Sequence, residues 1–278
     1  MATPNLGLSL EALHEKACVL RCDVVKMITA AKSGHPGGSL SATELITALY
    51  FGGVLRQDPA NPHDPGRDRF VLSKGHGVPI LYAALAEAGY FPVEQLETLR
   101  KLGSPLQGHP SKADFPLMEA STGSLGQGLS VGMGMALAGK LNQADYRVYV
   151  MLGDGECEEG QVWEAAMGAA AHKLDNLVAI LDHNKCQLDG TIEEILDWTP
   201  VPEKWAAFGW HVIEVDGHNI EAILAAFAEA KTVTGKPVCI VAHTVKGQGV
   251  SFMAGNNEWH GKAPSCDECA KALAELGA

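Results

Sequence analysis

The sequence predicts an α/β protein, in which a doubly wound parallel sheet carries helices on both faces. From Arg147 onward, apolar stretches of four to six residues alternate with helical stretches of about ten. This alternation is typical of βαβ crossovers, which bury parallel strands between two helical layers. No internal repeat, low-complexity stretch or linker divides the 278 residues, so we expect residues 1–278 to form a single domain.

The first half of the chain is predicted to be mostly helical. Apolar residues recur at helical spacing over 8–32, and Ser33 and Gly34 then break the pattern. The other expected elements are helices over 41–51, 79–87 and 93–99, a strand over 69–73, loops over 58–69 and 103–115, and a helix of small residues that follows the turn 121–128 and ends near Leu141.

The second half is predicted to supply most of the sheet. The expected strands are 148–152, 177–182, 211–215 and 238–243, and the expected helices between them are 161–172, 202–208 and 220–231. A polar loop near 247–264 and a short terminal helix follow. Together with 69–73, these strands make a sheet covered by helices on both sides.

Composition excludes several classes of partner. Lys and Arg total 21 and Asp and Glu total 33, so the net charge is −12, and a chain this acidic is repelled by nucleic acid and by anionic membranes. No apolar run approaches the roughly 18–20 residues of a membrane span, and charged residues interrupt 8–31, where a secretory signal would lie. The seven cysteines are scattered, which favours reduced thiols. We expect no nucleic acid, no membrane and a cytoplasmic location.

A candidate metal site follows two of the predicted strands. Asp154, in a Gly-Asp-Gly turn, comes directly after strand 148–152, at the edge where open parallel sheets bind ligands. Asn184 lies about 30 positions later, the length of one βαβ unit, so the two side chains should meet. With a backbone carbonyl, for which Cys186 is best placed, they form the oxygen set that Mg²⁺ or Ca²⁺ prefers. The alternative is that Asp154 only caps a helix that starts near Glu159.

Glycine is unusually frequent, at 31 of 278 residues, and many glycines lie beside histidines. These motifs are Ser33-Gly34-His35-Pro36-Gly37-Gly38, Ser73-Lys74-Gly75-His76, Gly108-His109-Pro110, Thr122-Gly123-Ser124-Leu125-Gly126-Gln127-Gly128, Gly153-Asp154-Gly155 with Glu159-Gly160, Asp182-His183-Asn184-Lys185 and Trp259-His260-Gly261. In the order and type of these motifs, the sequence resembles the transketolase family from about residue 10 to 265. Two positions depart from the family pattern: Ser124 stands where proline is usual, and Cys186 where an apolar residue is common.

The resemblance implies a thiamine-diphosphate-binding fold, with residues 1–278 as its diphosphate-binding domain. It implies that Asp154, Asn184 and the Cys186 carbonyl hold Mg²⁺, for which Ca²⁺ or Mn²⁺ can substitute. The residues implied to bind thiamine diphosphate are His76, Gly123, Ser124, Leu125, Gly155, Glu159, Asn184 and His260. Glycines let the backbone approach a phosphate, and helix N-termini offer free N–H groups. Leu125 as a core residue and Glu159 as a helix N-terminal carboxylate are the alternative interpretations.

Four histidines lie among glycine or proline rather than on an apolar helix face: His35, His76, His109 and His260. Loops often carry sites and imidazole titrates near neutrality, although any single histidine is more often structural. The resemblance implies that His35 and His260 move protons at the sugar hydroxyl and carbonyl, and that His109 binds the donor's hydroxymethyl end. The implied reaction transfers a two-carbon ketol unit from a ketose phosphate to an aldose phosphate, in the pentose phosphate pathway.

Family members carry further domains, and the second supplies the glutamate that activates the cofactor. We therefore expect either a fragment of a longer chain or, as the start at Met1 favours, the N-terminal subunit of a split transketolase. In the split enzyme Glu159 would reach toward that glutamate in a C-terminal, pyrimidine-binding subunit, with two copies of each chain. The alternatives are a subunit of another thiamine-diphosphate enzyme, either deoxyxylulose-phosphate synthase-like or α-type 2-oxo-acid dehydrogenase, and a non-catalytic assembly subunit. Cys266 and Cys269, with His260, are a weak zinc signal.

Overall fold

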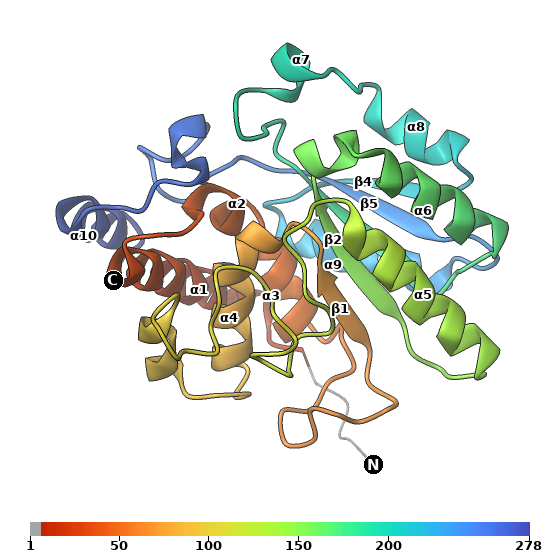
Figure 1. Ribbon diagram of the computed structural model, residues 1–278, viewed down its shortest axis with the longest axis horizontal. Coiled ribbons are helices and arrows are strands. Elements are labelled where there is room, and N and C mark those ends of the chain that lie inside the picture. The colour runs from red at the N-terminus through yellow and green to blue at the C-terminus, as the bar shows by residue number, and fades with distance from the viewer. Residues whose placement is uncertain (1–6) are drawn as a thin grey trace.

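The computed structural model describes residues 7–278, and these contain a five-stranded sheet (Figure 1). The strands lie in the order β1-β2-β3-β5-β4, and every neighbouring pair is parallel. Their bounds are β1 Arg69–Leu72, β2 Val148–Gly153, β3 Leu177–His183, β4 His211–Asp216 and β5 Val238–His243. The predicted parallel sheet is confirmed, and each predicted strand agrees with the observed bounds to within a residue.

Helices cover both faces of this sheet, as predicted. Successive side chains of a strand point to opposite faces, so Tyr149 and Met151 of β2 join one buried cluster and Val148, Val150 and Leu152 join the other. The helices of the first cluster are α1 Leu10–Ala31, α2 Pro36–Ser41, α3 Thr43–Phe51, α4 Val78–Glu87, α9 Ile220–Thr232 and α10 Cys266–Glu275. Those of the second are α5 Gln127–Leu141, α6 Gly160–Ala171, α7 Ile192–Ile195 and α8 Val201–Ala207. Figure 1 shows α5 and α6 side by side, away from α1, α3 and α4.

Short helices account for most differences from the predicted elements. The predicted helix 41–51 starts earlier, at Pro36, and is divided at Ala42 into α2 and α3; proline fits the first turn of a helix because its N–H would be unpaired there. The predicted helix 93–99 is a 3₁₀ helix, η2 Val93–Thr98. The other 3₁₀ helices are η1 Gly75–Gly77, η3 Gly155–Glu158 and η4 Asn257–His260. Within 7–278, no helix has both the length and the apolar character needed to cross a membrane.

Helix α5 packs against the sheet through small residues. Gly132 is buried, and a Cβ atom added there would lie 2.3 Å from Val150 Cγ2 of β2. Gly134 is exposed, and apart from its chain neighbours and the backbone of α5 no described atom lies within 4 Å of the position its Cβ would take. The close packing of α5 brings Thr122, in the turn before it, to the end of β1, where its hydroxyl donates to the Leu72 carbonyl at 2.7 Å.

Alanine should therefore have opposite effects at these two positions of α5. We expect Gly132→Ala to lower the free energy of unfolding by about 1–3 kcal/mol, because the new methyl group overlaps β2. We expect Gly134→Ala to raise it by about 0.5–1 kcal/mol, because alanine favours the helix and meets nothing. Urea unfolding of both variants measures the difference, and changes of the same sign would contradict this description of the packing.

Candidate active site

A pocket of about 300 Å³ opens at the carboxyl end of the sheet. Gly153 ends β2, Asn184 follows β3 and Lys246 follows β5, and all three line the pocket. This is the edge at which parallel sheets commonly bind ligands. The predicted site residues that line it are His76, Leu125, Asp154, Gly155, Glu159, Asn184, Cys186 and His260.

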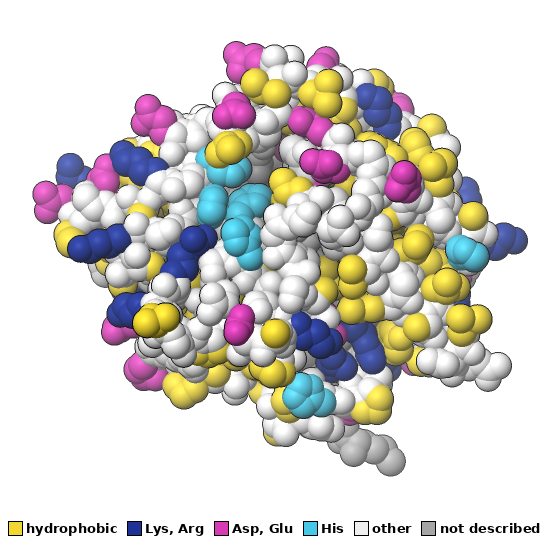
Figure 2. Space-filling view, viewed as in Figure 1, with side chains coloured by type: hydrophobic (Ala, Val, Ile, Leu, Met, Phe, Trp, Pro, Cys, Tyr) yellow, Lys and Arg dark blue, Asp and Glu magenta, His cyan; other side chains and the backbone are white. Residues whose placement is uncertain are grey.

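The structure brings the four predicted histidines together. The ring of His35 lies 5.2 Å from that of His76 and 5.6 Å from that of His260, measured between centroids. His76 and His260 are stacked at 5.1 Å, and His109 lies 6.3 Å from His35. Figure 2 shows histidine side chains gathered beside a hollow on this face. Residues that are far apart in the sequence therefore form one cluster at the pocket.

Two of the predicted cofactor-binding residues lie outside the pocket lining. Ser124 is exposed. Gly123 has a φ of +136° and lies against His109, since a Cβ there would be 3.1 Å from the imidazole ring. Gly123 thus borders the histidine cluster.

The Asp154 carboxylate is 1% exposed and is oriented by two hydrogen bonds. His183 Nδ1 donates to Oδ1 at 2.6 Å, and the Lys185 backbone N–H donates to Oδ2 at 2.6 Å. Burial raises the pKa of Asp154, although the bond from His183 lowers it. Helix α6 starts at Gly160 without a side-chain cap, and η3 receives none from Asp154. The helix-capping alternative is therefore not what the structure shows.

The expected magnesium ligands face one pocket and are of a suitable chemical kind. Asp154 offers carboxylate oxygens with unused lone pairs, and Asn184 Oδ1 accepts only the Cys186 N–H at 3.1 Å among the described bonds. With the Cys186 carbonyl, these are the hard oxygen donors that Mg²⁺ takes alongside phosphate oxygens. No group of three or more His, Cys, Asp or Glu in 7–278 could hold a metal ion, so Cys266 and Cys269 do not form a zinc site with His260 there.

Lys246, to which the sequence analysis gave no role, determines the tautomer of His260. Its ammonium donates to the Gln187 carbonyl at 2.9 Å, to Asn257 Oδ1 at 2.6 Å and to His260 Nδ1 at 2.7 Å. An ammonium only donates, so His260 Nδ1 accepts and the ring proton lies on Nε2. Burial lowers the pKa of Lys246 to about 8. His260 consequently presents an N–H donor from its other nitrogen.

The histidines of the cluster are neutral at pH 7. Burial, together with the neighbouring Arg100, lowers the pKa of His35 to about 4, and its buried Nδ1 has no hydrogen-bond partner among residues 7–278. Burial and the Lys246 ammonium lower the pKa of His260 to about 3. Burial also lowers the pKa values of His76 and His109. A neutral imidazole can both give and accept a proton, which suits acid and base steps at one site.

Three buried charged residues support the pocket, and the sequence analysis assigned none of them a role. Lys74 forms an ion pair with Asp182, and both are almost completely buried. Glu156 accepts from the backbone N–H groups of Gly126 at 3.0 Å and Gly153 at 3.1 Å, which ties the start of α5 to the end of β2. All three lie at or just after the ends of apolar strands, and a charge in that position is the sequence signal that could have identified them.

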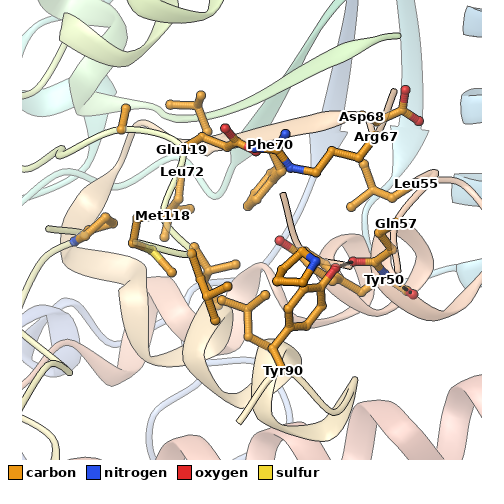
Figure 3. Close-up of a pocket in the computed structure, with 17 residues that line it drawn as sticks. Tyr50, Leu55, Gln57, Arg67, Asp68, Phe70, Leu72, Tyr90, Met118 and Glu119 are labelled. Atoms are coloured by element: carbon orange, nitrogen blue, oxygen red, sulfur yellow. Dashed lines mark hydrogen bonds and ion pairs between the residues drawn. The ribbon is translucent and has the colours of Figure 1, made fainter. Parts of the chain in front are cut away.

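A second, smaller cavity lies beside β1 and has a volume of about 50 Å³ (Figure 3). Four of its polar side chains bond to one another: Tyr90 Oη donates to Gln57 Oε1 at 2.9 Å, and Arg67 pairs with Glu119 at 2.6 Å. None of the predicted site residues lines it. The pocket that the predicted site residues line is therefore the candidate active site.

Known proteins resemble this chain in sequence and in structure. A family model described as "Transketolase, thiamine diphosphate binding domain" matches residues 13–278. One of the subunits of the apulose-4-phosphate transketolase of Phocaeicola vulgatus is 43% identical over 269 residues, which cover 97% of this chain and 95% of that protein. The 6-deoxy-6-sulfo-D-fructose transketolase subunit SqwG of a Clostridium species is 46% identical over 264 residues, covering 95% and 96%. The crystal structure of transketolase from Campylobacter jejuni matches with a TM-score of 0.91 and 32% identity, over 97% of this chain and 43% of that one.

The lowered pKa values of the cluster predict its response to acid. We expect the imidazole resonances of His35 and His260 to show no titration midpoint between pH 7 and pH 5, because the pKa values of the two rings are about 4 and about 3 and that of Lys246, which contacts His260, is about 8. NMR titration measures this, with His35→Asn and His260→Asn used to assign the signals and the exposed His172 as reference. A midpoint near the ordinary histidine value of about 6.5 would contradict the buried, neutral cluster.

Proposed function

The chain belongs to the transketolase family, and from that premise we propose that it is the N-terminal, diphosphate-binding subunit of a split transketolase. The observation that carries the proposal is that Asp154, Asn184, His76 and His260 line one pocket, and that His35 and His109, which lie outside its lining, cluster with these two histidines. The chain covers nearly the whole length of two relatives named as subunits but 43% of the Campylobacter jejuni transketolase chain. We therefore propose that residues 1–278 act as one domain of a two-chain enzyme.

The proposed cofactors are thiamine diphosphate and Mg²⁺, which Ca²⁺ or Mn²⁺ can replace. Asp154, Asn184 and the Cys186 carbonyl would hold the metal ion. Gly155 lines the pocket, and a residue without a side chain supports a close approach of the diphosphate to the backbone; a Cβ there would also lie 2.7 Å from Gln187 Cβ. When bound, thiamine diphosphate supplies the electron sink for cleaving the ketose carbon–carbon bond.

His76 and the Gly123, Ser124 and Leu125 turn are the other proposed contacts of the cofactor. His76 and Leu125 line the pocket directly, whereas Gly123 borders the histidine cluster beside His109 and Ser124 is exposed. His76 also stacks on His260, so one ring can contact the cofactor while the other faces the sugar.

We propose that the neutral histidines handle the protons of ketol transfer. His260 carries its proton on Nε2 because Lys246 occupies Nδ1, so it can donate to a sugar oxygen. His35, 5.6 Å away between ring centroids, can take or return the second proton. His109 would hydrogen-bond the hydroxymethyl end of the donor. One neutral imidazole can therefore donate a proton while the other accepts one, and the two can later exchange these roles.

The proposed partner is a C-terminal subunit that carries the pyrimidine-binding domain, in a complex of two copies of each chain. Glu159 is exposed at the pocket rim and free to reach a partner carboxylate. Helices α5 and α6 support an assembly surface: residues 127–139 contain no charged side chain, and Val131 and Met167 are 38% and 54% exposed. Figure 2 shows hydrophobic side chains on the flank where Figure 1 places α5 and α6.

The proposed substrates are sugar phosphates, and the proposed setting is the pentose phosphate pathway in the cytoplasm. The seven free cysteines support a reducing compartment. Relatives named for apulose 4-phosphate and for 6-deoxy-6-sulfo-D-fructose make these sugars alternative donors. The proposed reaction, transfer of a two-carbon ketol unit, is the same for each of these donors.

The function is tested by reconstitution with the partner. A tagged chain identifies the partner by co-purification, and the complex is assayed with xylulose 5-phosphate, apulose 4-phosphate, 6-deoxy-6-sulfo-D-fructose and pyruvate as donors. We expect ketol transfer that requires thiamine diphosphate, Mg²⁺ and both chains. We expect Asp154→Asn to reduce it about 100-fold by weakening metal binding, because loss of even a group that only orients a metal ligand costs about 10–100-fold. Full activity of the chain alone, or a complex that binds no cofactor, would contradict the proposal.

The assembly surface is tested by introducing a charge. We expect Met167→Glu on α6 to weaken association with the partner or with a second copy at least tenfold, because a carboxylate would be buried in an apolar contact. Val19→Glu on α1 is the matched control, since Val19 is 40% exposed on a helix that covers the opposite face of the sheet. Sedimentation velocity measures both variants, and equal effects would exclude α5 and α6 as the interface.

A further inference from the structure

The loop that follows β5, residues 244–250, carries Lys246 into the pocket. Residues outside the pocket lining form hydrogen bonds with the backbone of this loop. We infer that Arg21, Glu44 and His218 form a clamp that positions this loop, and through it the Lys246–His260 pair. Arg21 and Glu44 are 6% and 7% exposed, and none of the three lines the pocket. They are therefore positioning residues, and the inference rests on the proposed function because it assigns His260 a role in that reaction.

His218 forms a hydrogen bond with each of its two ring nitrogens, one with the loop and one with Glu44. Its Nε2 accepts the backbone N–H of Val245 at 2.8 Å, and its Nδ1 lies 3.0 Å from Glu44 Oε2. A backbone N–H only donates, so Nε2 must lack a proton and Nδ1 must carry one. His218 is thus held in a single tautomer that donates to Glu44 and accepts from the loop.

Arg21 holds the loop on the other side of Lys246. Its guanidinium pairs with Glu44 Oε1, and its Nε donates to the Gln248 carbonyl at 3.2 Å. Gly249, with a φ of +95°, makes room for this contact, because a Cβ there would lie 2.7 Å from Arg21 Nε. One buried carboxylate on α3 therefore orients a cation on α1 and an imidazole after β4.

The loop residues that form these hydrogen bonds lie on both sides of Lys246. Val245 precedes it, Gln248 follows two residues later, and the Gly247 N–H donates to the Gly37 carbonyl at 3.0 Å. The backbone on both sides of Lys246 is thereby fixed, so its ammonium reaches His260 Nδ1 at 2.7 Å with little freedom. A displacement of about 1 Å at a reacting group can cost roughly 100-fold in rate, so loss of the clamp should appear in the chemical step.

Two substitutions at His218 separate its two hydrogen bonds. The amide of glutamine reaches the position of Nε2, so His218→Gln can still accept from Val245. The shorter asparagine reaches only the position of Nδ1, so His218→Asn keeps a donor for Glu44 but leaves the Val245 N–H unpaired. His243→Gln is the matched control, because His243 also pairs with a glutamate, Glu214 at 3.0 Å, at the same edge of the sheet.

The complex of the full chain with its partner is assayed with each variant, at saturating thiamine diphosphate and Mg²⁺. We expect His218→Asn to lower kcat about 10–100-fold with KM changed less than about threefold, His218→Gln to keep kcat within about threefold, and His243→Gln to keep it within about twofold. Thermal unfolding of each variant checks that the fold is retained.

Amide hydrogen exchange of residues 244–250 in the full chain gives a readout that does not depend on activity. We expect faster exchange of Val245 in His218→Asn than in His218→Gln or in the control. Equal kcat for the Asn and Gln variants, or unchanged exchange at Val245, would overturn the clamp. Absence of ketol transfer by the unsubstituted complex would instead reject the proposed function, while the exchange data would still report on the clamp.

Discussion

The buried ion pair between Lys74 and Asp182 is the interaction on which the site depends most. Their side chains are 2% and 0% exposed, and a buried charge that loses its partner costs about 3–5 kcal/mol. Lys74 Nζ also donates to the Gly38 carbonyl at 2.6 Å, and Asp182 accepts from Ser41 Oγ at 2.6 Å and Thr244 Oγ1 at 2.5 Å. The pair therefore joins the ends of β1, β3 and β5 to α2, directly beneath the pocket.

The pocket shares the acidic character of the whole chain. The chain carries −12, and the pocket lining holds the carboxyl groups of Asp154, Glu156, Glu158 and Glu159 beside the ammonium groups of Lys74 and Lys246, of which Lys74 is paired with Asp182. Charges act more strongly in a partly desolvated site than across a solvated surface. The proposed metal ion would therefore have to offset these carboxylates before an anionic group could enter.

Much of the fold was predictable because its signals are local. Apolar runs bounded by charges or glycine gave the strands, and the spacing of one βαβ unit predicted that Asp154 and Asn184 would meet. The division at Ala42 was not predictable, because the residues on both sides of it are buried and show no helical periodicity in burial. The roles of Lys74 and Lys246 depend on partners such as Asp182, 108 positions from Lys74, and a single sequence does not show which buried polar groups pair.

The bonds that orient the site residues come from within this chain. Asp154 is held by His183 and Lys185, and His260 by Lys246, so none of these side chains needs a second chain to acquire its position. A half-site that is already organised loses little conformational entropy when a partner associates, and more of the contact energy is then available for binding. The conformational entropy of these side chains is therefore lost when this chain folds and not when a partner binds. A partner needs to add only its own groups.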